Sequence, residues 1–198
     1  MPVDIPARCN TLCRHLLQAT VLLSLGLWLP AAGAADGRFE VINATARLEG
    51  GVWLADARVD LVLSEGALEA LKNGVTLRIA FQHEVLRPRR FWTNEVISAG
   101  QMEFELEYLS LSQRYLVRNV ADQTVNSYAT LFSALRYLGQ LRDFTLIEDR
   151  LGDPPAGYEF GLRAVLDWQK LPGPLAILTF WRGDFSLESD WYRWTPKE

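Results

Sequence analysis

Alternation of apolar and polar residues is the dominant pattern of the chain, and it is cleanest from Gln101 to Tyr108. Successive side chains on a β-strand point to opposite faces, so a period of two predicts a strand with one apolar and one acidic face. The apolar positions are Met102, Phe104, Leu106 and Tyr108, and the acidic positions are Glu103, Glu105 and Glu107.

The same alternation recurs along most of the chain, with turn-forming residues between the alternating stretches. A Gly-Gly pair separates the first two stretches, which is typical of a β-hairpin. The predicted strands span residues 39–48, 52–63, 75–86, 91–97, 101–108, 114–118, 144–147, 158–168 and 184–194.

Two amphipathic segments predict short helices between these strands. Ser64 is a typical N-cap for a helix over residues 65–72, which Asn73-Gly74 would end. A second helix is expected from about Ser127 to Leu138, because its apolar residues recur with helical spacing and would form one buried stripe. That stripe consists of Tyr128, Leu131, Phe132, Leu135 and Leu138, and Gly139 would end the helix.

The order of these elements favours a mainly β (α+β) fold, because the helices are too brief and irregular for βαβ units. Ser98-Ala99-Gly100 is expected to end one strand before the next begins, which would make residues 75–118 a four-strand antiparallel meander. The expected architecture is an antiparallel β-sandwich, immunoglobulin-like in outline, with two short inserted helices.

The first 34 residues have the features of a secretory signal peptide. A basic start leads into a mostly apolar run from Leu16 to Leu29, and Ala32 and Ala34 supply the small residues that signal peptidase requires. The run is shorter than the ~20 apolar residues that span a bilayer, which favours cleavage over an uncleaved anchor. We therefore expect residues 1–34 to be removed and residues 35–198 to form one β-rich, periplasmic domain; an uncleaved signal would tether it to the membrane.

Cysteine, histidine and charge content restrict the chemistry of this domain. Both cysteines, Cys9 and Cys13, lie in the predicted signal, so a disulfide, a cysteine nucleophile and a cysteine zinc site are excluded. His83 is the one histidine after the signal, which excludes a site with two histidine ligands, and we expect it to be a hydrogen-bonded residue at the edge of the core. The whole chain has a net charge of −4, which disfavours nonspecific binding to nucleic acid. No cofactor, metal or catalytic constellation is predicted.

Two groups of aromatic residues are the candidate contact sites. The first, which we call the arginine turn, could grip lipid headgroups or an acidic partner, or could be an exposed hairpin turn whose arginines cover apolar edge surface. The second, the C-terminal aromatics, suits sugar or protein contacts, or could be a terminal strand that seals the core. The arginine turn comprises Arg87, Arg89, Arg90, Phe91 and Trp92, and the C-terminal aromatics are Trp181, Trp191, Tyr192 and Trp194.

Carboxylates offer weaker candidate sites. Alternate glutamates from Glu103 to Glu107 would lie ~6.5–7 Å apart on one strand face, and two of them could flank a glycosidic bond. The alternative is a solvated face whose charge prevents edge-to-edge pairing. Glu148, Asp149 and Asp153 could hold Ca²⁺, although they lack the spacing of a known calcium loop.

Several landmarks together resemble one family. They are the signal peptide, the Arg-Pro-Arg-Arg-Phe-Trp turn, the pair Tyr108 and Tyr115, and the pattern Leu171-Pro172-x-Pro174-Leu175 before a Trp-rich strand. Over nearly all of residues 35–198 the chain resembles the proteobacterial exported proteins of domain-of-unknown-function family 4390. That family has no assigned activity or site. The resemblance also implies a gene neighbourhood with a ribosomal-RNA methyltransferase and a membrane sensor kinase of the nitrogen-regulation type, which points to envelope sensing.

From these observations we expect a non-catalytic periplasmic interaction module whose partner is a membrane-bound signalling or envelope protein. The alternative is a small-ligand binder, for lipid or glycan, that uses the C-terminal aromatics or the sandwich interior. A third hypothesis is a hydrolase that uses Glu103, Glu105 or Asp167.

Overall fold

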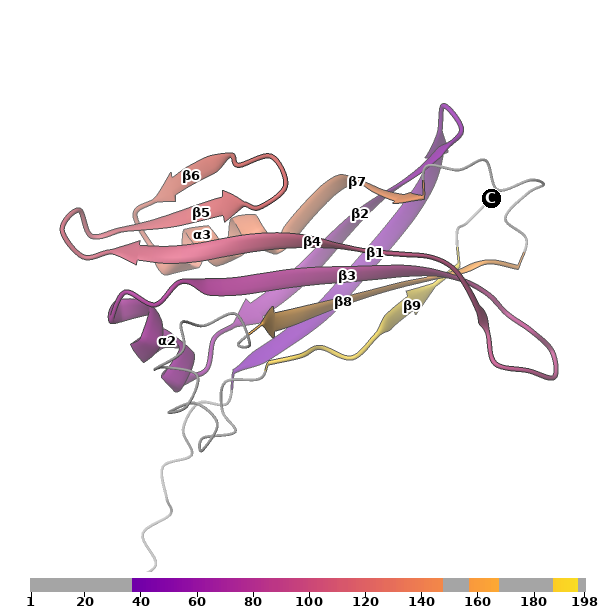
Figure 1. Ribbon diagram of the computed structural model, residues 1–198, viewed down its shortest axis with the longest axis horizontal. Helices are drawn as coiled ribbons and strands as arrows, with labels where there is room; N and C mark the ends of the chain where they lie inside the picture. The colour runs from indigo at the N-terminus through magenta and orange to yellow at the C-terminus, as the bar shows by residue number, and fades with distance from the viewer. Residues whose placement is uncertain (1–36, 148–156, 168–186, 196–198) are drawn as a thin grey trace, which may run out of the picture. The chain divides into compact units, whose positions relative to one another are not determined.

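A computed structural model describes residues 37–147, 157–167 and 187–195, so the predicted signal peptide lies outside the described residues. Figure 1 shows long strands in two layers with two short helices between strands. The elements are β1 (Arg38–Glu49), β2 (Val52–Val62), α2 (Glu65–Lys72), β3 (Leu77–Arg87), β4 (Glu95–Leu109), β5 (Arg114–Asn119), β6 (Val125–Tyr128), α3 (Leu131–Leu138), β7 (Gln140–Ile147), β8 (Glu159–Asp167) and β9 (Tyr192–Trp194).

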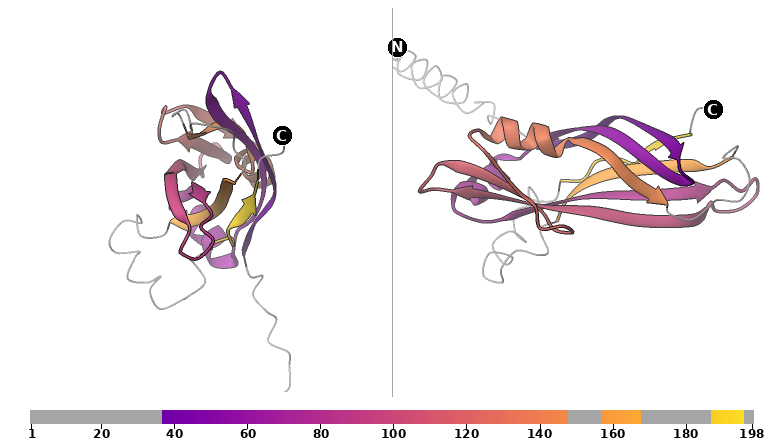
Figure 2. Two further views of the ribbon diagram at one scale, coloured as in Figure 1. Left: turned by 90° about the vertical axis from the view of Figure 1, so that its right-hand side faces the viewer. Right: turned by 90° about the horizontal axis from the view of Figure 1, so that it is seen from above.

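The strands form two antiparallel sheets that pack face to face, as the alternation predicts. The smaller sheet has the order β1-β2-β7, and the larger has the order β6-β5-β4-β3-β8-β9. The chain crosses from the smaller to the larger sheet through α2 and returns through α3. The end-on view in Figure 2 shows the two sheets as separate layers. The predicted antiparallel β-sandwich with two short helices is therefore confirmed.

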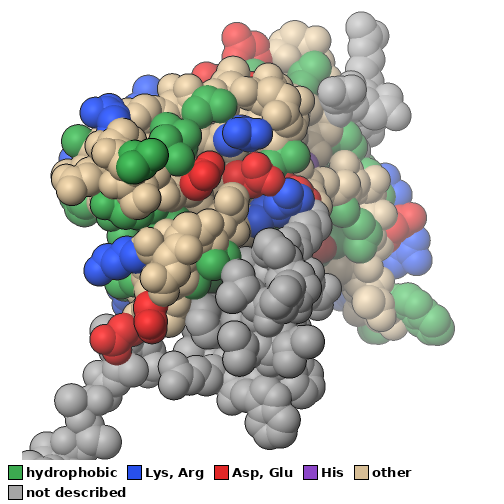
Figure 3. Space-filling model, turned by 60° about the vertical axis from the view of Figure 1, so that its left-hand side comes forward, with side chains coloured by type: hydrophobic (Ala, Val, Ile, Leu, Met, Phe, Trp, Pro, Cys, Tyr) green, Lys and Arg blue, Asp and Glu red, His purple; other side chains and the backbone are tan. Residues whose placement is uncertain are grey.

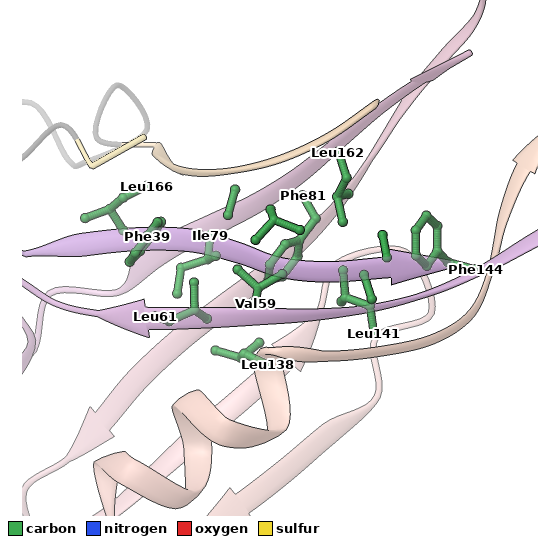
Figure 4. Close-up of a cluster of buried hydrophobic side chains, with 14 of the residues drawn as sticks. Phe39, Val59, Leu61, Ile79, Phe81, Leu138, Leu141, Phe144, Leu162 and Leu166 are labelled. Atoms are coloured by element: carbon green, nitrogen blue, oxygen red, sulfur yellow. The ribbon is translucent and has the colours of Figure 1, made fainter. Parts of the chain in front are cut away.

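The core lies between the sheets and is built from every second residue of each strand. On β2 the predicted apolar face is buried in full, with no residue from Trp53 to Leu63 on that face more than 8% exposed. Figure 4 shows side chains from both sheets meeting in this layer. Full burial of one such side chain contributes roughly 1.5–3 kcal/mol, so the core rather than any single contact stabilises the fold. The labelled members are Phe39, Val59, Leu61, Ile79, Phe81, Leu138, Leu141, Phe144, Leu162 and Leu166.

Helix α2 has the predicted bounds and caps. The Ser64 side chain accepts a hydrogen bond from the Ala67 amide at 3.3 Å, which satisfies one of the free N–H groups of the first turn. Asn73 is the C-cap, and Gly74 follows with φ +83°, a conformation that glycine adopts without steric cost. Ala67 and Leu71 are buried, so the helix closes the space where the chain passes between the sheets.

The four-strand meander predicted for residues 75–118 is wrong, because β4 continues through Ser98-Ala99-Gly100 instead of ending there. Gly100 pairs with His83 on β3, and a Cβ atom at Gly100 would lie 2.7 Å from His83 Nε2. The small residue makes room for an imidazole ring on the neighbouring strand. The segment therefore contains three strands, and residues 91–94 belong to the connection between β3 and β4.

The helix predicted from Ser127 is also wrong in its first third. Residues 125–128 form strand β6, which pairs with β5, and the helix begins only after Thr130. The Thr130 hydroxyl accepts a hydrogen bond from the Ser133 amide at 3.2 Å and so fixes the start. The buried stripe differs as well, since Ala134 and Leu138 are buried whereas Phe132 is 71% exposed. Gly139 ends the helix as predicted.

The last predicted strand is shorter than expected within the described residues. Strand β9 pairs with β8 over three residues, from Tyr192 to Trp194. Before it, Glu188 makes an isolated bridge to Val165, and Leu187 and Ser189 are buried. Residues 184–186 of the predicted strand lie outside the described residues.

Candidate interaction surfaces

The arginine turn forms the tip of the β3–β4 hairpin, which extends beyond the body of the larger sheet in Figure 1. Arg87 is the last residue of β3 and pairs with Glu95, the first residue of β4. The turn is therefore held between two paired strands. Phe91 is 90% exposed and Trp92 is 79% exposed. Two large apolar side chains at this exposure mark a contact site more strongly than scattered surface apolar residues do.

Ion pairs position the base of the turn. The Arg87 guanidinium donates to the Tyr158 hydroxyl at 2.9 Å and lies 3.3 Å from the Glu95 carboxylate, and both partners raise the pKa of Arg87. Arg89 lies 2.7 Å from the same carboxylate, and its hydrogen bond holds the pKa of Glu95 below the ordinary value. Three arginines against one glutamate leave a local excess of positive charge next to the exposed rings. Arg90, whose guanidinium lies 5.9 Å from the Phe91 ring centre, makes no ion pair with any described residue.

The C-terminal aromatics do not form one open platform in the described part of the chain. Trp194 packs against the buried Phe160 ring at 5.7 Å, and Tyr192 packs against Trp194 at 6.0 Å. Trp191 lies on the opposite face between the guanidinium groups of Arg163 and Arg193, at 4.7 and 5.6 Å from its ring centre. These contacts are those of a terminal strand that seals the edge of the core. Trp181 lies outside the described residues.

The acidic face of β4 is paired rather than free. Arg78 on β3 lies 3.1 Å from the Glu103 carboxylate and 2.5 Å from the Glu105 carboxylate. All three side chains are between 15% and 25% exposed, so the face is half-buried rather than solvated as expected. The bound guanidinium occupies the space between the two carboxylates, which does not favour the hydrolase hypothesis. The Asp167 side chain and the residues of the possible calcium loop lie outside the described part.

His83 is buried in the core, as its place on the apolar face predicts, but the expected hydrogen bond is missing. It is 8% exposed, its ring centre lies 5.8 Å from that of Phe144, and Nδ1 has no hydrogen-bond partner among the described residues. Burial lowers the pKa of His83, because the charged imidazolium loses its hydration there. The ring is therefore packed among buried side chains between the sheets.

A groove that sequence reasoning missed lies between α3 and the outer face of the smaller sheet; we call it the α3–β2 groove. Its apolar half has a volume of about 800 Å³, and its polar half has a volume of about 570 Å³. Arg58, Arg136 and Gln140 line both halves, so the two are continuous. The signal available in the sequence was the exposed position of Arg58 on β2, between two outward-facing aspartates. The exposure of Phe132 could not be predicted, because its helical spacing places it in the expected buried stripe.

Charges on the rest of the surface are mixed. In the face shown in Figure 3, basic and acidic side chains lie beside each other rather than in a field of one sign. Within residues 37–147, 157–167 and 187–195, no group of three or more His, Cys, Asp or Glu residues could hold a metal ion. In the same ranges, no helix is long and apolar enough to cross a membrane.

These features define a small antiparallel β-sandwich with a projecting hairpin tip and a lateral groove. A family model, described as a domain of unknown function (DUF4390), matches residues 36–195. The match covers most of the chain, so the protein belongs to the DUF4390 family. Comparison with curated proteins and with solved structures gives no significant match.

Proposed function

We propose that the protein is an exported, non-catalytic interaction module that docks onto a membrane-bound envelope or signalling protein through the arginine turn. The observation that carries the proposal is the pair Phe91 and Trp92, which are 90% and 79% exposed at a hairpin tip where three arginines face a single glutamate. Tryptophan and arginine are the residues that most often dominate binding energy at protein interfaces. The complementary surface would be an apolar pocket with an acidic rim.

The base of the turn favours a protein partner over a lipid surface. Arg87 is fixed by Tyr158 and Glu95, so the tip is positioned before binding and loses little conformational entropy on docking. Such preorganisation matters for insertion into a shaped pocket and brings no advantage on a fluid bilayer. The periplasmic location rests on the signal-like N-terminus, and the notion of a signalling partner rests on the family resemblance.

Site-specific photo-crosslinking in intact cells tests the proposal. A photoreactive residue at position 92 of the full-length chain should give one discrete protein adduct in the membrane fraction. The double change Arg89→Glu and Arg90→Glu should remove that adduct without changing the melting temperature, because exposed ion pairs contribute only ~0–1 kcal/mol. The control places the photoreactive group at Leu111, which is 102% exposed in the β4–β5 turn at the other end of the hairpin pair.

The outcomes distinguish a protein partner, a lipid surface and a purely structural turn. An adduct with lipid alone would mean that the turn contacts the bilayer and not a protein. Equal adducts from positions 92 and 111, or an adduct that survives the arginine changes, would overturn docking through the turn. Loss of folding in the double variant would show that the turn is structural.

A further inference from the structure

The α3–β2 groove, which lies apart from the arginine turn, joins an apolar surface to a cluster of arginines. We propose that it binds a single-chain amphiphile whose head is an anion, a carboxylate or a phosphate. The head would lie at Arg58 and Arg136, and the alkyl chain would lie along Ile42, Val62 and Phe132.

Helix α3 supplies one wall of the groove with a face that the core uses only in part, since Leu135 also packs against the core. Residues Phe132, Leu135, Arg136 and Gly139 follow the i, i+3, i+4, i+7 spacing and all line the apolar half. The opposite face of the helix carries the buried Ala134 and Leu138. Gly139 allows close approach to the sheet, since its carbonyl accepts a hydrogen bond from the Val59 amide at 2.8 Å and a Cβ there would lie 2.1 Å from the Val59 oxygen.

The outer face of the smaller sheet supplies the other wall. The bulge between Val41 and Asn43 interrupts the alternation on β1, and Ile42 is 49% exposed next to the groove. Val62 is 42% exposed and Phe132 is 71% exposed, so apolar side chains from three separate elements meet water at one place. Exposed apolar surface of this kind in a concave site is typical of ligand binding.

The polar half carries arginines that have no ion-pair partner among the described residues. Arg47 is held by ion pairs with Asp56 and Asp143, which satisfies both carboxylates. Arg58 and Arg136, like Arg142, make no ion pair with any residue of the described chain. Four arginines against two aspartates give this half an excess of two positive charges, although the whole chain carries −4. An anion placed here would meet guanidinium groups that need no other bond to be broken first.

The apolar half favours an alkyl chain over an extended peptide. Strand β2 pairs with β1 over its whole length and with β7 as far as Arg58, so only residues 60–62 have no strand partner on the side of α3 within the described chain, too short a stretch for an added peptide strand. The side chains of Ile42, Val62 and Phe132 offer no hydrogen bonds. A peptide backbone laid across them would lose bonds to water without replacement, whereas an alkyl chain has none to lose. The volume of about 800 Å³ lies within the range of sites that bind small molecules.

Titration calorimetry on the full-length protein, with probes below their critical micelle concentration, tests the site. Dodecyl phosphate and laurate separate a phosphate head from a carboxylate head, and dodecyltrimethylammonium has the same chain with the opposite charge. We expect saturable 1:1 binding of one or both anions, no saturable binding of the cation, and at least tenfold weaker binding of inorganic phosphate, which lacks the chain.

Variants assign the binding to the groove. Arg58→Gln and Arg136→Gln should each weaken binding about tenfold, which is the loss expected for one charge-assisted hydrogen bond. Phe132→Ser should weaken the dodecyl probes about tenfold and leave the melting temperature unchanged, because the ring is mostly exposed. The matched controls are Arg118→Gln, an exposed arginine on β5, and Leu111→Ser, both outside the groove.

Three results would overturn the proposal. They are the absence of saturable binding of both anions, equal binding of the cationic probe, and equal weakening by the groove variants and the control variants. None of them bears on docking through the arginine turn, which the position-92 crosslink tests separately.

Discussion

Replacing Gly100 by alanine should destabilise the protein, although alanine is normally the better residue inside a strand. Glycine in a strand interior costs roughly 0.5–1 kcal/mol relative to alanine because it loses more backbone freedom on folding. Here the added Cβ would lie 2.7 Å from Nε2 and 2.8 Å from Cε1 of His83, closer than real Cβ contacts. At position 100 the clash with His83 therefore outweighs the usual preference for alanine over glycine in a strand.

The size of the effect follows from how little the imidazole can move. His83 is 8% exposed and its far side packs against Phe144, so the ring cannot move into solvent without losing its core contacts. Forcing one extra methyl group into a filled core costs about 1–3 kcal/mol. After subtracting the gain in strand propensity, we expect Gly100→Ala to lower the free energy of unfolding by up to about 2.5 kcal/mol, with the middle of the range at ~1 kcal/mol.

A double-mutant cycle shows whether the clash with the ring is the cause. Urea unfolding would be measured for the wild type, Gly100→Ala, His83→Ala and the double variant. With the ring removed, Gly100→Ala should become neutral or stabilising, which gives a coupling energy of about 1–3 kcal/mol between the two positions. An alanine at position 100 that stabilises the protein in both backgrounds would refute the reasoning.

Two further predictions concern charge. Burial lowers the pKa of His83, so between that value and the unfolded value of about 6.5 the unfolded state binds a proton that the folded state refuses. The contribution of His83 to the free energy of unfolding should therefore be constant above about pH 6.5 and fall as the pH is lowered, by at most about 1.4 kcal/mol per pH unit. The wild type should lose stability relative to His83→Leu over this range, and a pH-independent difference between the two proteins from about pH 7.5 to about pH 5.5 would contradict this. Arg78→Met should lower the free energy of unfolding by about 1–3 kcal/mol, because two half-buried carboxylates lose their partner. Arg38→Met, whose pairs to Glu40 and Asp60 are exposed, should cost less than about 1 kcal/mol, and equal effects in thermal denaturation would count against the distinction.

The sequence by itself determined the elements whose signal is local. The alternation on β2 matches its buried face residue by residue, and Ser64 and Asn73-Gly74 bound α2 where capping chemistry requires. The position of the arginine turn also followed from the sequence, since a proline lacks the N–H group that a paired strand needs. Local backbone preferences and side-chain periodicity were sufficient in each case.

Tertiary structure decided the features that depend on a distant neighbour. Ser98-Ala99-Gly100 is a break by composition, but pairing with β3 keeps it in the middle of β4, and Gly100 leaves room for the His83 ring. Pairing with β5 overrode the helical spacing of residues 127 and 128, so the helix begins later than predicted, after the N-cap Thr130.

The groove between α3 and β2 depends on the same kind of long-range contact. Phe132 is exposed because Ala134 and Leu138 direct the opposite side of α3 to the core. Arg58 and Arg136 come from a strand and a helix far apart in the sequence, and only the packing of α3 against β2 brings them to one surface. Periodicity records which residues avoid water, but it does not record which elements lie opposite each other, and surface sites are assembled from that second kind of information.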